Sequence, residues 1–518
     1  MNRTALLMAA LLTLGVLGAC RVSAQASRPN VIIILADDQG HCELGAYLDR
    51  ATEENLGSPN AAQYRAIQSC TEKKAPVAVC FEAARKCMPT VDALARNGVR
   101  FTSFVSAPTC APARSLLMSA RYPQGFGVYC NDDIVSGTVK GVPAEVNFPV
   151  RLFKEAGYLT GLCGKWHLGS KPGQHPNDRG FDYFFGFDRA HTEKYDSKLL
   201  QRNGQSVPAN GWLADQISDE AVAFLQRADK EQRPFFLYVA YNEPHGPTPR
   251  PPQKYIDHFK SGSDIVDVHF ATIYGMDQGI GRIVAELKRS GRFENTLILF
   301  GADNGAGAPK SVGFNSPNYN VPVPGNGPFR GGKWTPWEGG VRVPFIACLP
   351  KGAAKTSDAL VSMMDVLPTA LDYAGIKIPD SYKLDGRSFL PILQGTSAGE
   401  KERTLFWAGE TSEPFPGEEW SPAFAELAGR ANGLKKGNFL PCWYVRTPQW
   451  KLVAWDNLAP ALIDMTKDPC EWQDVSKQNP DVVRRLRQQF DDWIVVQKPP
   501  LAYDRKQWEK LLPEKAKP

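Results

Sequence analysis

The sequence of 518 residues has little excess charge and no long run of lysine or arginine. Its formal net charge is +5, and removal of residues 1–24, which carry two arginines and no acidic residue, lowers it to +3. So small a positive charge is weak for a polynucleotide-binding protein, but it is compatible with small anionic substrates. We therefore expect no nucleic-acid partner.

Cysteine is too sparse for a scaffold held together by disulfides, with 11 cysteines in the whole chain. An exported protein can nevertheless carry a few bridges. Cys70, Cys80 and Cys87 fall within one short segment and are the best candidates for bridge formation. The sequence leaves the pairing open.

Long apolar runs are confined to the first twenty residues, which combine a charged start with an apolar core of secretory length. We expect residues 1–24 to be a signal peptide and the protein to be periplasmic or extracellular, without a transmembrane span in the mature chain. Cleavage after Ala24 competes with a lipoprotein box, Leu17-Gly18-Ala19-Cys20, which would leave a lipid anchor on Cys20. We favour soluble export.

The rest of the chain alternates short apolar runs with amphipathic helical segments. The runs at 30–36, 158–163, 235–241 and 296–300 are typical of strands buried on both faces of a parallel sheet. The pattern predicts an α/β fold with a large, doubly wound, mixed but mostly parallel sheet flanked by helices. We expect this domain over residues 28–399, with residues 42–86 as an irregular insertion. Short aromatic-rich runs then predict a smaller antiparallel-sheet domain over 400–518.

Polar side chains follow several of these apolar runs, at the strand ends where ligands bind in doubly wound folds. Asp37 and Asp38 follow the first run, and Asp303 and Asn304 follow the run at 296–300. Each pair alone would be an ordinary turn signal. Together they offer only oxygen ligands, which favour a hard cation such as Ca²⁺ or Mg²⁺ over zinc.

The segment Cys110-Ala111-Pro112-Ala113-Arg114 carries a second chemical signal. Proline is tolerated in a first helical turn, so Cys110 is predicted to lie at the positive end of a helix dipole. Arg114 is about one turn further on, on the face of Cys110, where it could hold an anion or activate a nucleophile. Without further context, a buried cysteine beside a surface arginine is the more common arrangement.

This Cys-x-Pro-x-Arg pattern resembles the signature of the type I sulfatases, in the alkaline phosphatase superfamily. In that family the cysteine is oxidised to formylglycine, whose hydrated aldehyde is the nucleophile. The usual residue at position 113 is serine, and we expect the alanine here to affect maturation more than chemistry. The resemblance extends from about Asn30 to Trp493. It implies an alkaline phosphatase-like fold and hydrolysis of sulfate esters, with a formylglycine-generating or sulfatase-maturating enzyme as a partner during biogenesis.

The resemblance also implies roles for individual residues. It gives catalytic roles to Cys110, Arg114, Lys165, His167, His245 and Lys333, and one calcium ion to Asp37, Asp38, modified Cys110, Asp303 and Asn304. Lys165 would steady the nucleophile's oxygen, and His167 would deprotonate the geminal diol. His245 and Lys333 would bind sulfate near the leaving oxygen and protonate it. Arg114 would support the formylglycine.

Export and the habits of bacterial relatives favour a sulfated polysaccharide or glycosaminoglycan as the substrate. Trp334, Trp337, Trp420 and Trp443 are candidates for stacking on sugar rings, although aromatic residues more often pack in the core. Two other functions remain open. One is a phosphonate or phosphate ester hydrolase of the same superfamily, and the other is an anion-binding protein that never acquires the aldehyde.

Overall fold

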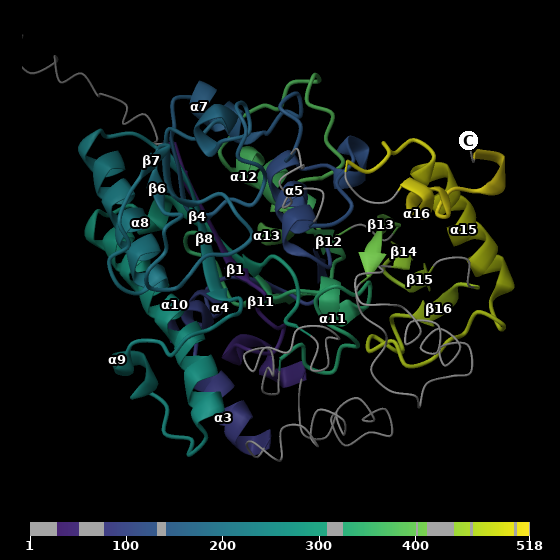
Figure 1. Cartoon of the computed structure of the whole chain (residues 1–518), viewed down its shortest axis with the longest axis horizontal. Coiled ribbons are helices and arrows are strands. Elements are labelled where there is room, and N and C mark those ends of the chain that lie inside the picture. Colours follow the sequence, from purple (N-terminus) through teal and green to yellow (C-terminus); the bar gives the residue numbers. More distant parts are fainter. Residues whose placement is uncertain are drawn as a thin grey trace, which may run out of the picture.

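A ten-stranded sheet is the central element of the computed structural model, with the strand order β11-β2-β10-β9-β1-β8-β4-β5-β6-β7 (Figure 1). The structure describes residues 28–50, 77–131, 141–307, 325–399, 402–411, 440–455, 459–501 and 505–516. The predicted signal peptide, Cys20, Cys70 and Trp420 lie outside these ranges. Among the described residues, no helix combines the length and apolar composition that crossing a bilayer requires.

The four middle strands of the sheet run parallel. They are β9 (Thr296–Ala302), β1 (Asn30–Asp37), β8 (Phe235–Pro244) and β4 (Leu159–Lys165), and every residue in them is buried. Ile33 of β1 lies between Tyr238 of β8 and Leu299 of β9 in the register. Their carboxyl ends therefore meet at one edge of the sheet, as the apolar runs predicted.

The outer strands make the sheet mixed. β5 (Tyr183–Phe187) is parallel to β4, whereas β10 (Phe345–Cys348) is antiparallel to both β9 and β2 (Val99–Phe101). The remaining strands are β11 (Lys355–Ser357), β6 (Gln201–Arg202) and β7 (Gln205–Ser206). The segment 99–105 is not one continuous strand, because β3 (Phe104–Val105) leaves the large sheet and pairs with β12 (Val361–Ser362).

Helices cover both faces of the sheet. α8 (Leu213–Lys230) and α10 (Asp264–Arg289) pack against β4 and β8, and α4 (Pro89–Ala95) packs against β10. Figure 1 shows α5 and α12 on the other side of the central strands. The bounds of these two helices are α5 (Cys110–Ser119) and α12 (Val366–Tyr373), and a further helix is α7 (Val150–Glu155). The shorter helices are α9 (Gln253–Ile256), α11 (Glu338–Val341) and α13 (Leu390–Leu393).

The predicted irregular insertion contains regular structure. It begins with a 3₁₀ helix over Gly45–Arg50, and α3 (Val77–Lys86) packs against α10. Cys80 and Cys87 are both buried, free thiols, so the bridge considered between these two is not formed. The Cys87 thiol instead donates a hydrogen bond to the carbonyl of Glu43 over 3.0 Å.

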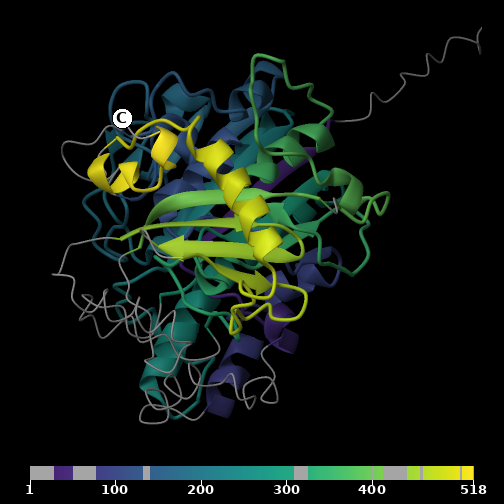
Figure 2. The same cartoon turned by 90° about the vertical axis from the view of Figure 1, so that its right-hand side faces the viewer.

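The C-terminal part forms the smaller antiparallel sheet that the sequence predicted. Its strands are β13 (Leu405–Thr411), β14 (Leu440–Arg446), β15 (Trp450–Trp455) and β16 (Ala461–Asp464). One face joins the main core, and Figure 2 shows α15 (Pro480–Ile494) crossing the other face. Leu486, Phe490 and Ile494 form the contact of α15 with that sheet, and α16 (Arg505–Glu509) follows.

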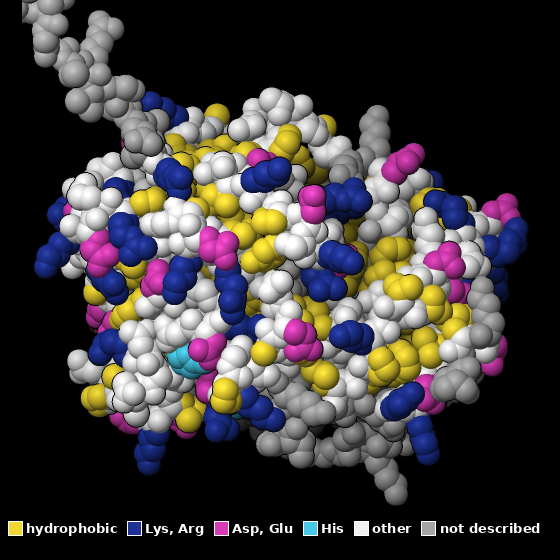
Figure 3. Space-filling view, turned by 90° about the horizontal axis from the view of Figure 1, so that it is seen from above, with side chains coloured by type: hydrophobic (Ala, Val, Ile, Leu, Met, Phe, Trp, Pro, Cys, Tyr) yellow, Lys and Arg dark blue, Asp and Glu magenta, His cyan; other side chains and the backbone are white. Residues whose placement is uncertain are grey.

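The outer surface carries charges of both signs. Figure 3 shows the face seen from above Figure 1, with basic and acidic side chains intermixed across its coloured part. Such mixing agrees with the small net charge of the sequence.

Candidate functional site

The predicted polar residues meet at the carboxyl edge of the four middle strands. Asp37 and Lys165 are the last residues of β1 and β4, while Asp303 and His245 directly follow β9 and β8. β9, β1, β8 and β4 are successive neighbours in the sheet, so residues more than 250 positions apart in sequence become adjacent in space. The structure thus brings the predicted metal-binding and catalytic groups to one place.

Asp37 is fully buried and surrounded by cations. Lys165 Nζ donates to both of its carboxylate oxygens, at 2.9 and 2.7 Å, and Arg114 Nη2 lies 3.5 Å from Oδ1. Burial alone would raise the pKa of Asp37, but the charges of Lys165, His245 and Arg114 hold that pKa well below its usual range. Asp37 is therefore a carboxylate at any physiological pH.

Asp38 turns the chain away from the strand, with φ at 66°, in the left-handed region that Asp tolerates better than most residues. Its backbone N–H donates to Asp303 Oδ1 over 3.1 Å. Its carboxylate accepts from Asn304 Nδ2 at 2.8 Å and from Lys333 Nζ at 2.7 Å. The turn thus joins the β1 and β9 ends and brings Lys333 to the same centre.

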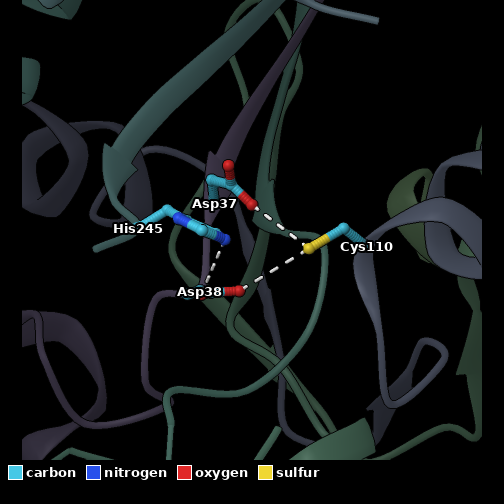
Figure 4. A group of neighbouring side chains, drawn as sticks. All are labelled: Asp37, Asp38, Cys110 and His245. Carbon is cyan, nitrogen blue, oxygen red and sulfur yellow. Dashed lines mark hydrogen bonds and ion pairs between the residues drawn. The ribbon is translucent and has the colours of Figure 1, made fainter. Parts of the chain in front are cut away.

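Cys110 is the first residue of α5, a helix in which every side chain is buried. Its Sγ lies 3.6 Å from Asp37 Oδ1 and 3.8 Å from Asp38 Oδ1 (Figure 4). Burial raises the pKa of the Cys110 thiol, and the charges of Lys165 and Lys333 only partly oppose this. As a cysteine, this residue is a neutral thiol and a poor nucleophile.

The position of Arg114, one turn along α5 from Cys110, had suggested that its charge could hold an anion. In the structure its charge is instead taken up by contacts within the protein. Its guanidinium is fully buried and donates to Asp303 Oδ2 at 2.8 and 3.1 Å. It also donates to the Lys165 carbonyl at 3.3 Å and to the Tyr238 hydroxyl at 3.2 Å. Sequence reasoning missed Tyr238, whose only signal is that it is one of two tyrosines in the apolar run at 235–241.

The two predicted site histidines differ in their contacts. The segment at His167 is not extended, because its φ is 58°, and within the described part of the chain neither ring nitrogen has a hydrogen-bond partner. Burial, with the charges of Lys165 and Arg114, lowers the pKa of His167 well below its usual range. His245 places Nε2 3.6 Å from Asp38 Oδ2, and burial lowers its pKa to about 3.

The site gathers donor atoms that could hold a metal ion. Asp37, Asp38, Cys110 and His245 each offer one ligand atom, and these atoms lie within 4.8 Å of one another (Figure 4). Asn304 Oδ1 is buried without a hydrogen-bond partner among the described residues. This carbonyl oxygen could therefore bind a cation. Asp303 is less available, because its oxygens already accept from Asp38, Asn304 and Arg114.

Comparison with known proteins assigns this arrangement to a family. The sequence model of the family described as "Sulfatase" matches residues 29–376. The chain is 36% identical over 417 residues to "Uncharacterized sulfatase YdeN" of Escherichia coli (strain K12), covering 76% of this chain and 70% of that protein. It is 30% identical over 409 residues to the N-acetylgalactosamine-6-sulfatase of Canis lupus familiaris, covering 74% of this chain and 69% of that protein.

Solved structures agree with the sequence comparison. The crystal structure of Ps i-CgsB in complex with k-i-k-neocarrahexaose superposes with a TM-score of 0.73 at 26% identity, covering 95% of this chain and 99% of that one. The match includes the small C-terminal sheet as well as the large one, because so little of either chain is left out. The chain therefore belongs to the sulfatase family of sulfuric ester hydrolases, as its Cys-x-Pro-x-Arg signature indicated.

Proposed function

We propose that this sulfatase hydrolyses sulfate esters of carbohydrates with an oxidised Cys110 as its nucleophile and one calcium ion. The substrate class is supported by the N-acetylgalactosamine-6-sulfatases among its relatives and by the neocarrahexaose complex of Ps i-CgsB. The observation that carries the mechanism is the position of Cys110 Sγ, buried between the carboxylates of Asp37 and Asp38.

An unmodified thiol at this position is badly suited to attack an anionic ester. Burial raises the pKa of Cys110, and two carboxylates within 4 Å oppose a thiolate there. Formylglycine supplies a hydroxyl of its hydrated aldehyde in place of the thiol. Two lysines then favour the oxygen nucleophile, because Lys165 is paired with Asp37 and Lys333 with Asp38, the two carboxylates on either side of residue 110.

The proposed calcium ligands are Asp37, Asp38, Asp303 and Asn304, together with the modified residue 110. Calcium would neutralise negative charge on the sulfate. Three buried carboxylates, Asp37, Asp38 and Asp303, already face three buried cations, Arg114, Lys165 and Lys333. A bound divalent cation would give this nearly neutral centre the positive charge that a sulfate ester requires.

Proton transfers are assigned to the two histidines and Lys333. His245 Nε2 and Lys333 Nζ both point at Asp38 Oδ2, at 3.6 and 2.7 Å, so both can reach one bound sulfate oxygen. An arriving anion raises the pKa of His245, which allows it, with Lys333, to donate a proton to the leaving oxygen. His167 is neutral, and neither ring nitrogen has a hydrogen-bond partner among the described residues, so it can accept a proton when sulfate is released.

The deciding experiment has two measurements on protein from its native host. Mass spectrometry of the Cys110 peptide tests for the aldehyde, and an unmodified thiol would contradict the proposed nucleophile. Turnover is then compared on N-acetylgalactosamine 6-sulfate, sulfated neocarrahexaose, 4-nitrophenyl sulfate and 4-nitrophenyl phosphate. We expect hydrolysis of the sulfates with at most trace activity on the phosphate; the reverse order would favour a phosphate ester hydrolase.

Cys110→Ala is the matched variant. Turnover should fall to background, because no other side chain at the centre carries the nucleophile, whereas the thermal unfolding temperature should change little. Normal sulfate release by this variant would refute the assignment, and wild-type protein that binds sulfate without turnover would support the anion-binding alternative.

We further propose that the protein is exported and matured by a formylglycine-forming enzyme. The proposal is supported by residues 1–24 and by the Cys-x-Pro-x-Arg signature. Cell fractionation and the intact mass of the mature chain test it. Protein retained in the cytoplasm with its first 24 residues would contradict export, and a lipid-modified Cys20 would replace soluble export by membrane anchoring.

A further inference from the structure

The exposure of the site residues locates the opening of the site. Asp37, Lys165, His167, Asp303 and Asn304 are completely buried. By contrast, His245 is 8% exposed, Asp38 6% and Lys333 3%. A sulfate ester larger than sulfate itself must keep its alcohol part on the solvent side. The alcohol therefore leaves the centre past His245 and Lys333.

His191 extends the His245 side of this opening toward the solvent. Its ring is exposed and lies nearly parallel to the His245 ring, with 5.9 Å between centroids and 11° between planes. The segment is fixed to the end of β8, because Asn242 Nδ2 donates to the Thr192 carbonyl over 3.2 Å. The buried Lys194 donates to the Asn242 carbonyl and lies 3.7 Å from the Glu243 carboxylate.

Trp334 extends the Lys333 side. Its indole is partly exposed, and Lys333 Nζ lies 5.7 Å from the ring centroid. Its φ of 75° is in the left-handed region, which is costly for a tryptophan and persists only where the surroundings impose it. Its N–H donates to the Pro108 carbonyl over 2.8 Å, two residues before Cys110. The backbone of Trp334 is therefore tied to the segment that leads into Cys110.

The other tryptophans considered as sugar-stacking residues do not compete for this role. Trp337 is fully buried and packs against Trp455 with 4.9 Å between ring centroids. Trp443 is buried and stacks on Phe490 of α15, with ring centroids 4.3 Å apart. Of the three that the structure describes, only Trp334 is partly exposed, and it directly follows Lys333 in sequence.

We propose that His191 and Trp334 form the two walls of the opening and contact the sugar ring that carries the sulfate. This inference rests on the proposed function. An indole face packs against the apolar C–H face of a pyranose, and an imidazole can hydrogen-bond to ring hydroxyls. The two residues thus select the sugar and leave sulfate binding to Lys333, His245 and the cation.

The test separates sugar contact from sulfate contact. His191→Ala, Trp334→Ala and Trp334→Phe are prepared in the full, matured chain. KM and kcat are measured with N-acetylgalactosamine 6-sulfate and sulfated neocarrahexaose, and Ki with inorganic sulfate. For each alanine variant we expect KM to rise about tenfold, the size of one lost aromatic contact, with sulfate Ki unchanged within about twofold. Trp334→Phe should recover part of the loss.

His258→Ala is the matched control. His258 also stacks in parallel on an aromatic ring, that of Tyr274 in α10, at 4.0 Å and 5°, and its Nε2 lies 3.3 Å from the Lys86 carbonyl. The KM of the His258→Ala variant should equal that of the wild type. Unchanged KM in the His191 and Trp334 variants would overturn the inference, as would a parallel rise of KM and sulfate Ki. If Trp334→Ala fails to fold, His191→Ala and Trp334→Phe decide.

Failure of the proposed function has a different signature. A wild type that hydrolyses 4-nitrophenyl sulfate but neither saccharide would refute the carbohydrate substrate. The walls are then tested on that ester by the same comparison of KM with sulfate Ki, and an unchanged KM would refute them too.

Discussion

Arg114 and Asp303, 189 residues apart in sequence, form a fully buried ion pair with 2.8 Å between Nη2 and Oδ2. Two guanidinium nitrogens donate to the same carboxylate oxygen. The pair fixes α5, which carries Cys110, to the end of β9, which carries the proposed calcium ligands. Arg114 therefore supports the site by positioning it.

Arg114→Ala should destabilise the fold strongly, because it leaves Asp303 buried without its partner. Breaking a buried pair in this way costs about 3–5 kcal/mol. Urea unfolding measures the loss, and activity should disappear with it. The control is Arg227→Ala, which removes an exposed pair with Glu231 of 2.7 Å and should cost less than about 1 kcal/mol. Equal effects of the two substitutions would contradict the structural role of Arg114.

Removal of the proposed calcium ion should abolish activity and lower the unfolding temperature, and added calcium should restore both. Asn304→Ala should reduce bound calcium, because it deletes the buried carbonyl oxygen that has no partner among the described residues. Metal content per chain, measured by mass spectrometry, is the readout. Asn97→Ala, at an exposed position whose amide caps the Ala93 carbonyl at 3.0 Å, should retain full calcium. Wild-type calcium in Asn304→Ala would remove Asn304 from the ligand set.

A buried ionic network connects the small sheet to the segment that carries Lys333. Lys451 Nζ of β15 lies 3.0 Å from Glu338 Oε1 and 2.7 Å from Glu471 Oε1. Glu338 is the first residue of α11, and its N–H donates to Glu471 Oε2 over 2.6 Å. The C-terminal part therefore helps to hold the segment from Lys333 to Glu338, where α11 begins.

Lys451→Met should destabilise the protein by about 3–5 kcal/mol, because two carboxylates stay buried without their shared cation. The same substitution should also raise the Ki of inorganic sulfate, because the segment that carries Lys333 would be held less firmly in place. Lys467→Met is the control, since Lys467 is 83% exposed and lies 3.5 Å from Asp464 in the same part of the chain. An unchanged sulfate Ki in Lys451→Met would limit the network to a stabilising role.

Stability should depend on pH through Asp277 of α10. Burial raises the pKa of Asp277 from 3.8 to about 7, although its carboxylate accepts backbone hydrogen bonds from Thr90 and Val91, each 3.0 Å long. The folded state therefore binds more protons than the unfolded state between these values, and stability falls as pH rises from about 4 to 7.

Asp277→Asn removes this titration. Its amide replaces one acceptor, so its unfolding temperature should be lower than that of the wild type at pH 5. The deficit should shrink or reverse at pH 8, where the wild type carries a buried charge. Thermal unfolding at the two pH values measures this change, and a deficit that does not shrink between pH 5 and pH 8 would show that folding does not raise the pKa of Asp277.

The positions of the middle strands could be predicted because each is a continuous apolar run that ends in a polar residue. That pattern also grouped Asp37, Lys165, His245 and Asp303, since parallel strands end at one edge. The resemblance added Lys333, which no local pattern singled out. The contacts of Arg114 with Asp303 and of Lys451 with Glu338 could not be predicted. Each joins two segments far apart in sequence, and apolar periodicity does not show which distant segments meet.

The helix within the 42–86 insertion was missed for a different reason. Its buried positions are Cys80, Phe81, Ala83 and Ala84, of which only Phe81 is a large apolar residue, so the apolar pattern is weak. Packing against α10 stabilises this helix more than its own sequence does. His191 was missed because an exposed histidine in a loop has no signal until its ring is seen beside that of His245.

Every residue of α5 is buried, and Cys110 itself is 1% exposed. A second protein cannot reach the sulfur of the finished fold, so the proposed oxidation of Cys110 would have to precede folding of the segment around α5. A chain that folds with its thiol intact would then stay inactive. Treating purified, folded protein with the oxidising enzyme should rescue none of that pool, whereas the same treatment during refolding should.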